Sequence, residues 1–168
     1  TGERLLVEMQ KVRLDLGEGK AWFEGTQLNS LDALMVKKIG ARYSPDLLDR
    51  LELLRFLEAR GVKIFSSPLS IMRVLDRLSC TVTLQIARIP MPPTSVTEDV
   101  DEALHAVENY GEAVFKPLYT SKARGMCLIE AGPGARHRIA EYQAENPIMY
   151  IQKKIDLHGR DLGVAFLG

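Results

Sequence analysis

The stretch Val114-Phe115-Lys116-Pro117-Leu118 places one lysine inside an apolar run that is typical of a β-strand. An ammonium group is costly to remove from water unless an anionic group meets it. Residues 119–125 follow with two hydroxyls, two further cations and one glycine, and residues 126–129 form a second apolar run. This order favours a hairpin that lies over a polyphosphate. The alternative is an edge-strand lysine whose head group stays in water.

The composition is that of an ordinary globular chain of 168 residues, 46% of them hydrophobic, which is enough for one domain or two small ones. Lys plus Arg and Asp plus Glu both number 22, which argues against a general nucleic-acid or membrane-surface binder. Cys80 and Cys127 lie far apart and form no disulfide framework or metal pattern, so a reducing, cytoplasmic compartment is expected. No apolar run approaches the roughly 20 residues of a membrane span.

Residues 31–65 predict a strand–helix–strand unit. A strand over residues 31–36 precedes a helix with Ser44 as N-cap and Pro45 at its first position, and Gly61 ends this helix before a strand at 62–65. The expected apolar stripe of the helix is Leu47, Leu48, Leu51, Leu54 and Leu57. Short connections in this order predict a parallel sheet. Further strands are expected at residues 5–9, 11–16 and 21–24.

The second half of the chain predicts a small α+β lobe. A helical region over residues 69–86 leads to Pro90, Pro92 and Pro93, a stiff linker that we interpret as a lobe boundary. Expected beyond it are strands at 94–97, 113–118, 126–130 and 148–155 and helices at 100–110 and 135–145. Because the chain lacks an initial methionine and both ends fall in strand-like runs, we interpret it as a fragment of a longer protein.

Several familiar sites are missing from the sequence. It has no G-x-x-x-x-G-K-[ST] phosphate loop, and Gly132-Pro133-Gly134 lacks the third glycine of a dinucleotide fingerprint. His105, His137 and His158 do not have the spacing of metal ligands. What remains is Lys116 with its basic loop, and a second polar segment over residues 150–161.

Six segments follow one another in a characteristic order along residues 33–168. They are Val36-Lys37-Lys38-Ile39-Gly40, Ile64-Phe65-Ser66-Ser67-Pro68, Asp76-Arg77-Leu78, Ile89-Pro90-Met91-Pro92-Pro93-Thr94, Val114-Phe115-Lys116-Pro117-Leu118 and Tyr150-Ile151-Gln152-Lys153-Lys154-Ile155. The ordered set resembles the ATP-grasp superfamily. Within it, the chain is most similar to the RimK-like ligases, which add glutamate to ribosomal protein S6 or to a coenzyme tail.

The resemblance implies an α/β fold in three parts. These are a Rossmann-like pre-ATP-grasp domain with a parallel sheet over residues 1–68, a connecting helix and proline-rich linker over 69–93, and the small α+β ATP-grasp lobe with the start of the second lobe over 94–168. The C-terminal lobe, with the catalytic residues and the Mg²⁺ ligands, is then expected beyond Gly168. Residues 1–168 alone are therefore expected to be inactive and to hold no metal.

The resemblance also implies an ATP site. Lys116 matches the lysine that contacts the α and β phosphates, and residues 120–125 match the loop that covers them. The hinge over residues 152–155 would meet adenine through Gln152 and the main chain of Lys154 and Ile155. The implied ATP-binding residues are Arg77, Lys116, Ser121, Lys122, Arg124, Gly125, Gln152, Lys153, Lys154, Ile155 and Asp161, the last of which matches the acid that bonds the ribose hydroxyls.

Three positions depart from the family pattern. Arg77 stands where lysine is usual, Gly125 is the one glycine left in a loop that is usually glycine-rich, and Lys153 stands where an acidic residue is usual. Arginine keeps the charge of lysine but not its geometry. The loop and the hinge departures suggest an atypical subgroup.

The implied function is an ATP-dependent carboxylate–amine ligase that forms an amide bond through an acyl phosphate, with glutamate or a similar amino acid as a candidate substrate. The expected cofactors are ATP and Mg²⁺, and the expected partners are a carboxylate and an amine, including a protein or peptide tail, and no nucleic acid or membrane. A homo-oligomer is open, since related ligases are often dimers or tetramers. Two alternatives stay open: a nucleotide-binding or regulatory protein without ligase activity, and a plain Rossmann-like domain that binds a sugar or a protein, with Lys116 on its surface.

Overall fold

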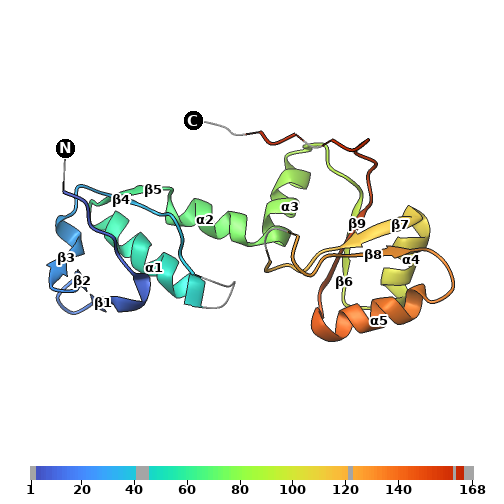
Figure 1. Ribbon diagram of the computed structural model, residues 1–168, viewed down its shortest axis with the longest axis horizontal. Helices are drawn as coiled ribbons and strands as arrows, with labels where there is room; N and C mark the ends of the chain where they lie inside the picture. The colour runs from blue at the N-terminus through green and yellow to red at the C-terminus, as the bar shows by residue number, and fades with distance from the viewer. Residues whose placement is uncertain (1–2, 41–45, 121–122, 161, 165–168) are drawn as a thin grey trace. The chain divides into compact units, whose positions relative to one another are not determined.

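The computed structural model describes residues 3–40, 46–120, 123–160 and 162–164. The chain forms two compact units, Thr1–Cys80 and Thr81–Gly168. The described helices and strands (Figure 1) are η1 (Met9–Lys11), β1 (Val12–Asp15), β2 (Lys20–Phe23), β3 (Thr26–Gln27), η2 (Leu28–Ser30), β4 (Ala33–Met35), α1 (Asp46–Ala59), β5 (Lys63–Phe65), α2 (Pro68–Leu75), α3 (Arg77–Ile86), β6 (Thr94–Thr97), α4 (Val100–Tyr110), β7 (Glu112–Phe115), β8 (Cys127–Glu130), α5 (Ala135–Glu145) and β9 (Met149–Lys153).

The first unit begins with a three-stranded antiparallel meander in the order β1-β2-β3. Its second turn holds only Glu24 and Gly25, whose φ angles of 45° and 85° are both positive. Two left-handed residues make the tight turn whose twist matches that of a hairpin, and glycine is favoured there because it has no Cβ. Asn29 holds β2 from the side, since its Oδ1 accepts the N–H of Ala21 at 2.7 Å.

A strand–helix–strand unit follows, as the sequence predicts. β4 and β5 pair in parallel, with Leu34 opposite Ile64, and both side chains pack against the core that includes Leu57 of α1. Val62 donates its N–H to the carbonyl of Leu57 at 3.1 Å, and Gly61 has a φ of 94°, so the helix ends in a glycine C-cap.

Four local predictions for the first unit need correction or lie outside the described residues. Leu47, Leu51, Leu54 and Leu57 are buried, but Leu48 is 50% exposed and does not belong to the stripe. The predicted strand at residues 5–9 is wrong: residues 5–8 form no regular element, and Met9 starts a 3₁₀ turn. Leu6 in this segment is 83% exposed, so the segment is apolar in sequence but contributes little buried surface. Ser44 and Pro45 lie outside the described residues.

The single helical region expected over residues 69–86 is two helices, α2 and α3. They are separated by Asp76, whose Oδ1 accepts the N–H of Ser79 at 2.9 Å. An aspartate that bonds the backbone three residues ahead is an N-cap, and it starts a new helix instead of continuing the old one. The sequence stretch is therefore helical as predicted but interrupted at its only acidic residue.

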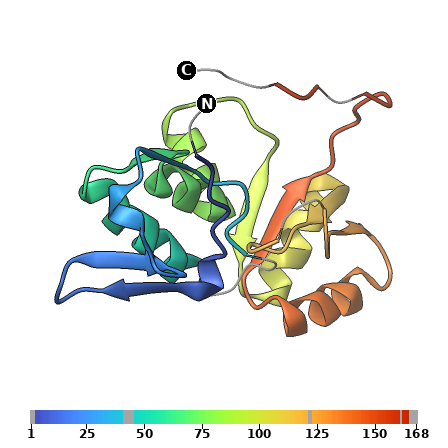
Figure 2. The same cartoon turned by 60° about the vertical axis from the view of Figure 1, so that its left-hand side comes forward.

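The second unit is built on a four-stranded antiparallel sheet in the order β6-β9-β7-β8. β6 lies at one edge beside β9 (Figure 2), and β8 forms the other edge. α4 and α5 have the predicted bounds. α4 is capped by Asp99, whose side chain accepts the N–H groups of Asp101 and Glu102, and it ends at Gly111, with a φ of 76°. Such caps satisfy backbone groups that the helix itself leaves unpaired.

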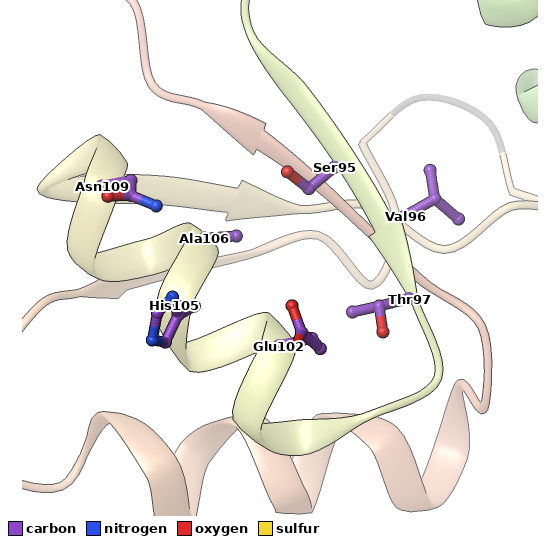
Figure 3. A pocket seen from close by; sticks show the side chains of 7 residues that line it. All are labelled: Ser95, Val96, Thr97, Glu102, His105, Ala106 and Asn109. Atoms are coloured by element: carbon purple, nitrogen blue, oxygen red, sulfur yellow. The ribbon is translucent and has the colours of Figure 1, made fainter.

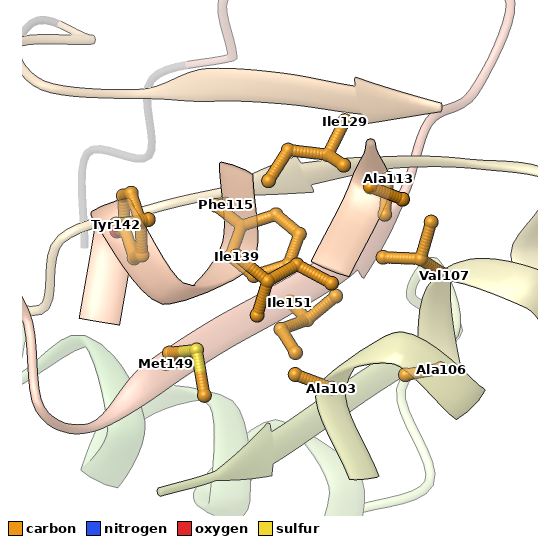
Figure 4. Close-up of a cluster of buried hydrophobic side chains, with 11 residues drawn as sticks. Ala103, Ala106, Val107, Ala113, Phe115, Ile129, Ile139, Tyr142, Met149 and Ile151 are labelled. Carbon is orange, nitrogen blue, oxygen red and sulfur yellow. The ribbon is translucent and has the colours of Figure 1, made fainter. Parts of the chain in front are cut away.

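The core of this unit lies between one face of the sheet and its two helices (Figure 4). Phe115 at its centre has no exposed surface, and its ring meets that of Tyr142 edge-on, with centroids 5.2 Å apart. The strand residues of the core are Ala113, Phe115, Ile129, Met149 and Ile151, and the helix residues are Ala103, Ala106, Val107, Ala135, Ile139 and Tyr142. Because side chains alternate along a strand, every second residue of β7 and β9 is left for the opposite face.

The predicted parallel unit in the first half of the chain and the separate antiparallel sheet in the second are thus both confirmed. The observed strands are shorter than predicted: β7 ends at Phe115 and β9 ends at Lys153. The finer division into residues 1–68, 69–93 and 94–168 stays a prediction. None of the described helices is both long enough and apolar enough to cross a bilayer.

Candidate nucleotide-binding face

Lys116 lies just past the end of β7, on the face of the sheet that α4 and α5 do not cover. Its backbone N–H still donates to the carbonyl of Tyr150 in β9 at 2.9 Å, so the lysine is fixed in the sheet although it lies outside the strand proper. Val114 opposes Gln152 in the ladder, which puts Val114, Lys116, Tyr150 and Gln152 on the same face. The core residues Phe115 and Ile151 point the other way.

The ammonium group of Lys116 donates a hydrogen bond to the amide of Gln152. Its Nζ donates to Oε1 of Gln152 at 2.5 Å, although the two residues are 36 positions apart in the sequence. Both side chains are half-buried. An amide oxygen orients an ammonium without neutralising its charge, so the contact with Gln152 leaves the positive charge of Lys116 in place.

Gln152 is the centre of a wider hydrogen-bond network. Its Nε2 donates to Oγ1 of Thr94 in β6 at 2.9 Å and lies 3.4 Å from the hydroxyl of Tyr150. The hydroxyls of Tyr150 and Thr81 are 2.9 Å apart. Thr94 and Tyr150 belong to sequence segments that carry the family resemblance, but neither is among the predicted site residues. Their part depends on strand pairing between residues distant in sequence, and no local pattern reports that pairing.

The main chain of the predicted hinge is partly used by the sheet. Lys153 donates its N–H to the carbonyl of Pro93 at 2.8 Å, and Lys154 donates its N–H to that of Glu112 at 3.0 Å. The side chains of Lys153, Lys154 and Ile155 are exposed. Nζ of Lys154 lies 2.7 Å from a carboxylate oxygen of Glu112, and this hydrogen bond raises the pKa of Lys154. A ligand at Lys154 would therefore meet its carbonyl oxygen, because its amide proton is already donated.

The described part of the loop after Lys116 folds back on itself. Oγ1 of Thr120 donates to the carbonyl of Arg124 at 3.0 Å. Gly125 has a φ of 69°, and a Cβ there would lie 3.1 Å from Cγ of Pro117. This backbone conformation and close approach explain why glycine remains at this position of the loop. The side chain of Arg124 is exposed.

The remaining predicted site residues are Arg77, Ser121, Lys122 and Asp161. Arg77 is the first residue of α3, one position after the capping Asp76, and it belongs to the first unit. Ser121, Lys122 and Asp161 lie outside the described residues. In the described part of the chain, no group of three or more His, Cys, Asp or Glu side chains is arranged to hold a metal ion.

A hollow of about 410 Å³ lies elsewhere in the second unit, between β6 and α4 (Figure 3). Ser95, Val96 and Thr97 line it from the strand, and Glu102, His105, Ala106 and Asn109 line it from the helix. None of these is a predicted site residue. The side chains of His105 and Glu102 are on the exposed side of α4, so the hollow is distinct from the Lys116–Gln152 cluster.

No protein-family model matches the sequence. Among curated proteins, the tetrahydromethanopterin:alpha-L-glutamate ligase of Methanosarcina acetivorans is 32% identical over 152 residues, which make up 84% of this chain and 47% of the relative. Enzymes of the same name from two other methanogens also match. The chain spans about half the length of the first of these relatives.

The fold is that of solved ATP-grasp structures. D-alanyl-alanine synthetase A from Vibrio cholerae superposes with a TM-score of 0.63 at 12% identity over 86% of this chain and 44% of the other. A RimK domain ATP-grasp protein from Sphaerobacter thermophilus superposes with a TM-score of 0.55 at 23% identity, over 74% of this chain and 46% of the other. The chain therefore has the ATP-grasp fold and resembles the RimK-like ATP-grasp ligases.

Proposed function

We propose that this chain is the nucleotide-binding part of an ATP-dependent carboxylate–amine ligase, an enzyme that forms an amide or peptide bond through an acyl phosphate. The observation that carries the proposal is the contact between Lys116 and Gln152 on the face of the sheet that α4 and α5 do not cover. The resemblance assigns these residues to the two ends of one nucleotide, the phosphates and the base. The similarity to glutamate ligases supports glutamate, or a similar amino acid, as the amine.

The chemistry of the described residues fits ATP. The charged Nζ of Lys116 is ordered by an amide, so it can bind a phosphate oxygen through a charge-assisted hydrogen bond. Oε1 of Gln152 is an acceptor of the kind that the exocyclic amino group of adenine requires. Arg124, Lys153 and Lys154 add positive charge along the loop and hinge, which favours a polyanion. Bound ATP would supply the phosphoryl group that activates the carboxylate, and these residues would hold and orient it.

Mg²⁺ belongs to the proposal as a partner of ATP, but the described residues include no set of carboxylates that would hold it. No residue of this chain is therefore assigned to the metal. The proposal also includes Ser121, Lys122 and Asp161 as nucleotide contacts and a cytoplasmic location. Cys80 and Cys127 are both unpaired, as is usual in a reducing compartment.

A nucleotide-binding or regulatory protein without ligase activity is the second candidate. It is favoured by the phosphate-covering loop, which has one glycine and is closed by the Thr120–Arg124 hydrogen bond. Such a loop gives less freedom of closure than a glycine-rich one. The two candidates share the nucleotide site and differ in whether an amide product forms.

The test has a binding arm and a turnover arm, both in the full-length protein. Lys116→Met keeps side-chain length and removes the charge, so it should weaken binding of a non-hydrolysable ATP analogue about ten- to hundredfold by calorimetry, which corresponds to roughly 1.5–3 kcal/mol. Lys20→Met is the control, since Lys20 pairs with Glu18 in the first unit. Equal dissociation constants for wild type and Lys116→Met would contradict the proposed site. ADP release that requires both a carboxylate and an amine would establish ligation, and its absence with ATP binding intact would establish the second candidate.

A further inference from the structure

We propose that Thr94 is a positioning residue of this site: its hydroxyl fixes the amide of Gln152 so that Oε1, and not Nε2, faces Lys116. This role presupposes the nucleotide site proposed above. Thr94 lies at the start of β6, directly opposite Gln152 in the ladder, and the two residues are 58 positions apart in the sequence.

The direction of each hydrogen bond determines the next one. Oγ1 of Thr94 donates its single proton to the carbonyl of Pro92 at 2.9 Å, so toward Gln152 it can only accept. The nitrogen of the amide must therefore face Thr94, as it does at 2.9 Å. With Nε2 there, Oε1 is turned to Nζ of Lys116 at 2.5 Å. A hydroxyl has one proton to donate, and an ammonium accepts no hydrogen bond. Each group in this series of hydrogen bonds, from Pro92 to Lys116, therefore has only one possible orientation.

The opposite amide orientation would lose both contacts. Nε2 would face the ammonium, donor against donor, and Oε1 would face a hydroxyl whose proton is already donated to Pro92. The hydroxyl of Tyr150 reinforces the observed orientation, because it lies 3.4 Å from Nε2 and is itself 2.9 Å from the hydroxyl of Thr81. Tyr150 is buried, with 4% of its surface exposed, so its hydroxyl has little access to water as a substitute partner.

The consequence for function is that the side chain of Lys116 is held in one conformation. A lysine side chain has many rotamers, and ordering it at the moment of binding opposes affinity. An acceptor held in place at Oε1 orders the ammonium before the phosphates arrive. Without the hydroxyl of Thr94, the Gln152 amide loses its fixed orientation, and the ammonium loses an acceptor that is held in place. The geometry thus links the start of β6, next to the proline-rich segment, to the cation that would hold the phosphates.

The test compares three variants. Thr94→Val removes the hydroxyl but keeps the branched shape, Thr94→Ser restores a hydroxyl, and Ser95→Ala removes the neighbouring hydroxyl, which bonds Tyr110 instead. The first readout needs no nucleotide: the rate at which an amine-acylating reagent modifies Lys116, followed by mass spectrometry of the peptide. We expect roughly a three- to tenfold faster rate in Thr94→Val, from the net worth of one hydrogen bond, and rates within about twofold of wild type in the other two variants.

The second readout is the affinity for a non-hydrolysable ATP analogue, which should weaken by the same factor in Thr94→Val and recover in Thr94→Ser. An unchanged Lys116 acylation rate in Thr94→Val, in a protein whose circular dichroism matches the wild type, would overturn the positioning role. Wild-type protein that binds no ATP analogue would instead overturn the proposed function. The acylation rates would still decide separately whether Thr94 orders Lys116, so the two failures are distinguishable.

Discussion

Replacing Phe115 with alanine should unfold the second unit at a lower denaturant concentration without affecting the first. Phe115 is fully buried, packs edge-on against Tyr142, and immediately precedes Lys116. The buried clusters of the two units share no residue: one contains Phe115 and Ile151, and the other contains Phe23 and Leu57. Separate cores predict separate cooperative transitions.

The expected size of the effect follows from the burial. Truncating a fully buried phenylalanine to alanine typically costs about 3–5 kcal/mol, of which the edge-on aromatic contact contributes about 0.5–1.5 kcal/mol. With a urea slope of about 1.5 kcal/mol per molar for a small unit, the midpoint should fall by about 2–3 M. If the unit is too weak to survive this loss, Phe115→Leu removes less volume and should cost about 1–2 kcal/mol.

Two probes separate the units. Trp22 is the only tryptophan and lies in β2 of the first unit, so its fluorescence reports that unit, and hydrogen exchange of β7 and β9 peptides reports the second. Phe115→Ala should shift only the exchange transition. The matched variant Leu54→Ala, at a buried position of α1, should shift only the fluorescence transition. A Phe115→Ala protein whose Trp22 midpoint falls as far as its exchange midpoint would refute the reasoning.

Two further predictions concern local chemistry. Burial raises the pKa of the Cys127 thiol, so its thiolate forms at a higher pH than in the unfolded chain. Alkylation of Cys127 near pH 8.5, about the ordinary thiol pKa, should therefore be slower than alkylation of the exposed Cys80. Equal alkylation rates of the two thiols in the folded protein, measured by mass spectrometry, would count against this prediction. Gly25→Ala forces a side chain onto a φ of 85° and should destabilise the first unit by about 1 kcal/mol, as read from the Trp22 midpoint. Gly17→Ala, at a glycine without a positive φ, should have a smaller effect, and a larger one would be inconsistent with the turn.

The sequence predicts the bounds of α4 and α5, because local features mark their ends. Asp99 and Gly111 bound α4, and apolar spacing defines its buried face. The bounds of strands are predicted less accurately, because a strand ends where its pairing with a neighbouring strand ends. The run at residues 5–9 is apolar but forms no strand, and β7 ends one residue before Lys116. The break at Asp76 has a local signal, an acidic residue that can cap, but the same residue type also occurs inside helices.

In the candidate site, too, the features that depend on pairing between distant strands could not be predicted from the sequence. That Lys116 and Gln152 act together was implied by the family resemblance, and neither periodicity nor spacing alone would have paired residues 36 positions apart. Thr94 and Tyr150 were missed because their part depends on the ladder register, with Thr94 opposite Gln152 and Val96 opposite Tyr150. A single sequence contains no local record of register between distant strands.

The most direct test of the central claim, that ATP binds on the face of the second unit's sheet that α4 and α5 do not cover, is a map of where the nucleotide contacts this chain. A chain of 18.8 kDa is small enough for residue-resolved amide NMR during titration with a non-hydrolysable ATP analogue. We predict that the shifts concentrate at residues 114–120, 123–125 and 150–155, and that the Gln152 side-chain amide shifts with them. Shifts confined to the hollow between β6 and α4, around His105 and Asn109, or no saturable shifts at all, would contradict the account.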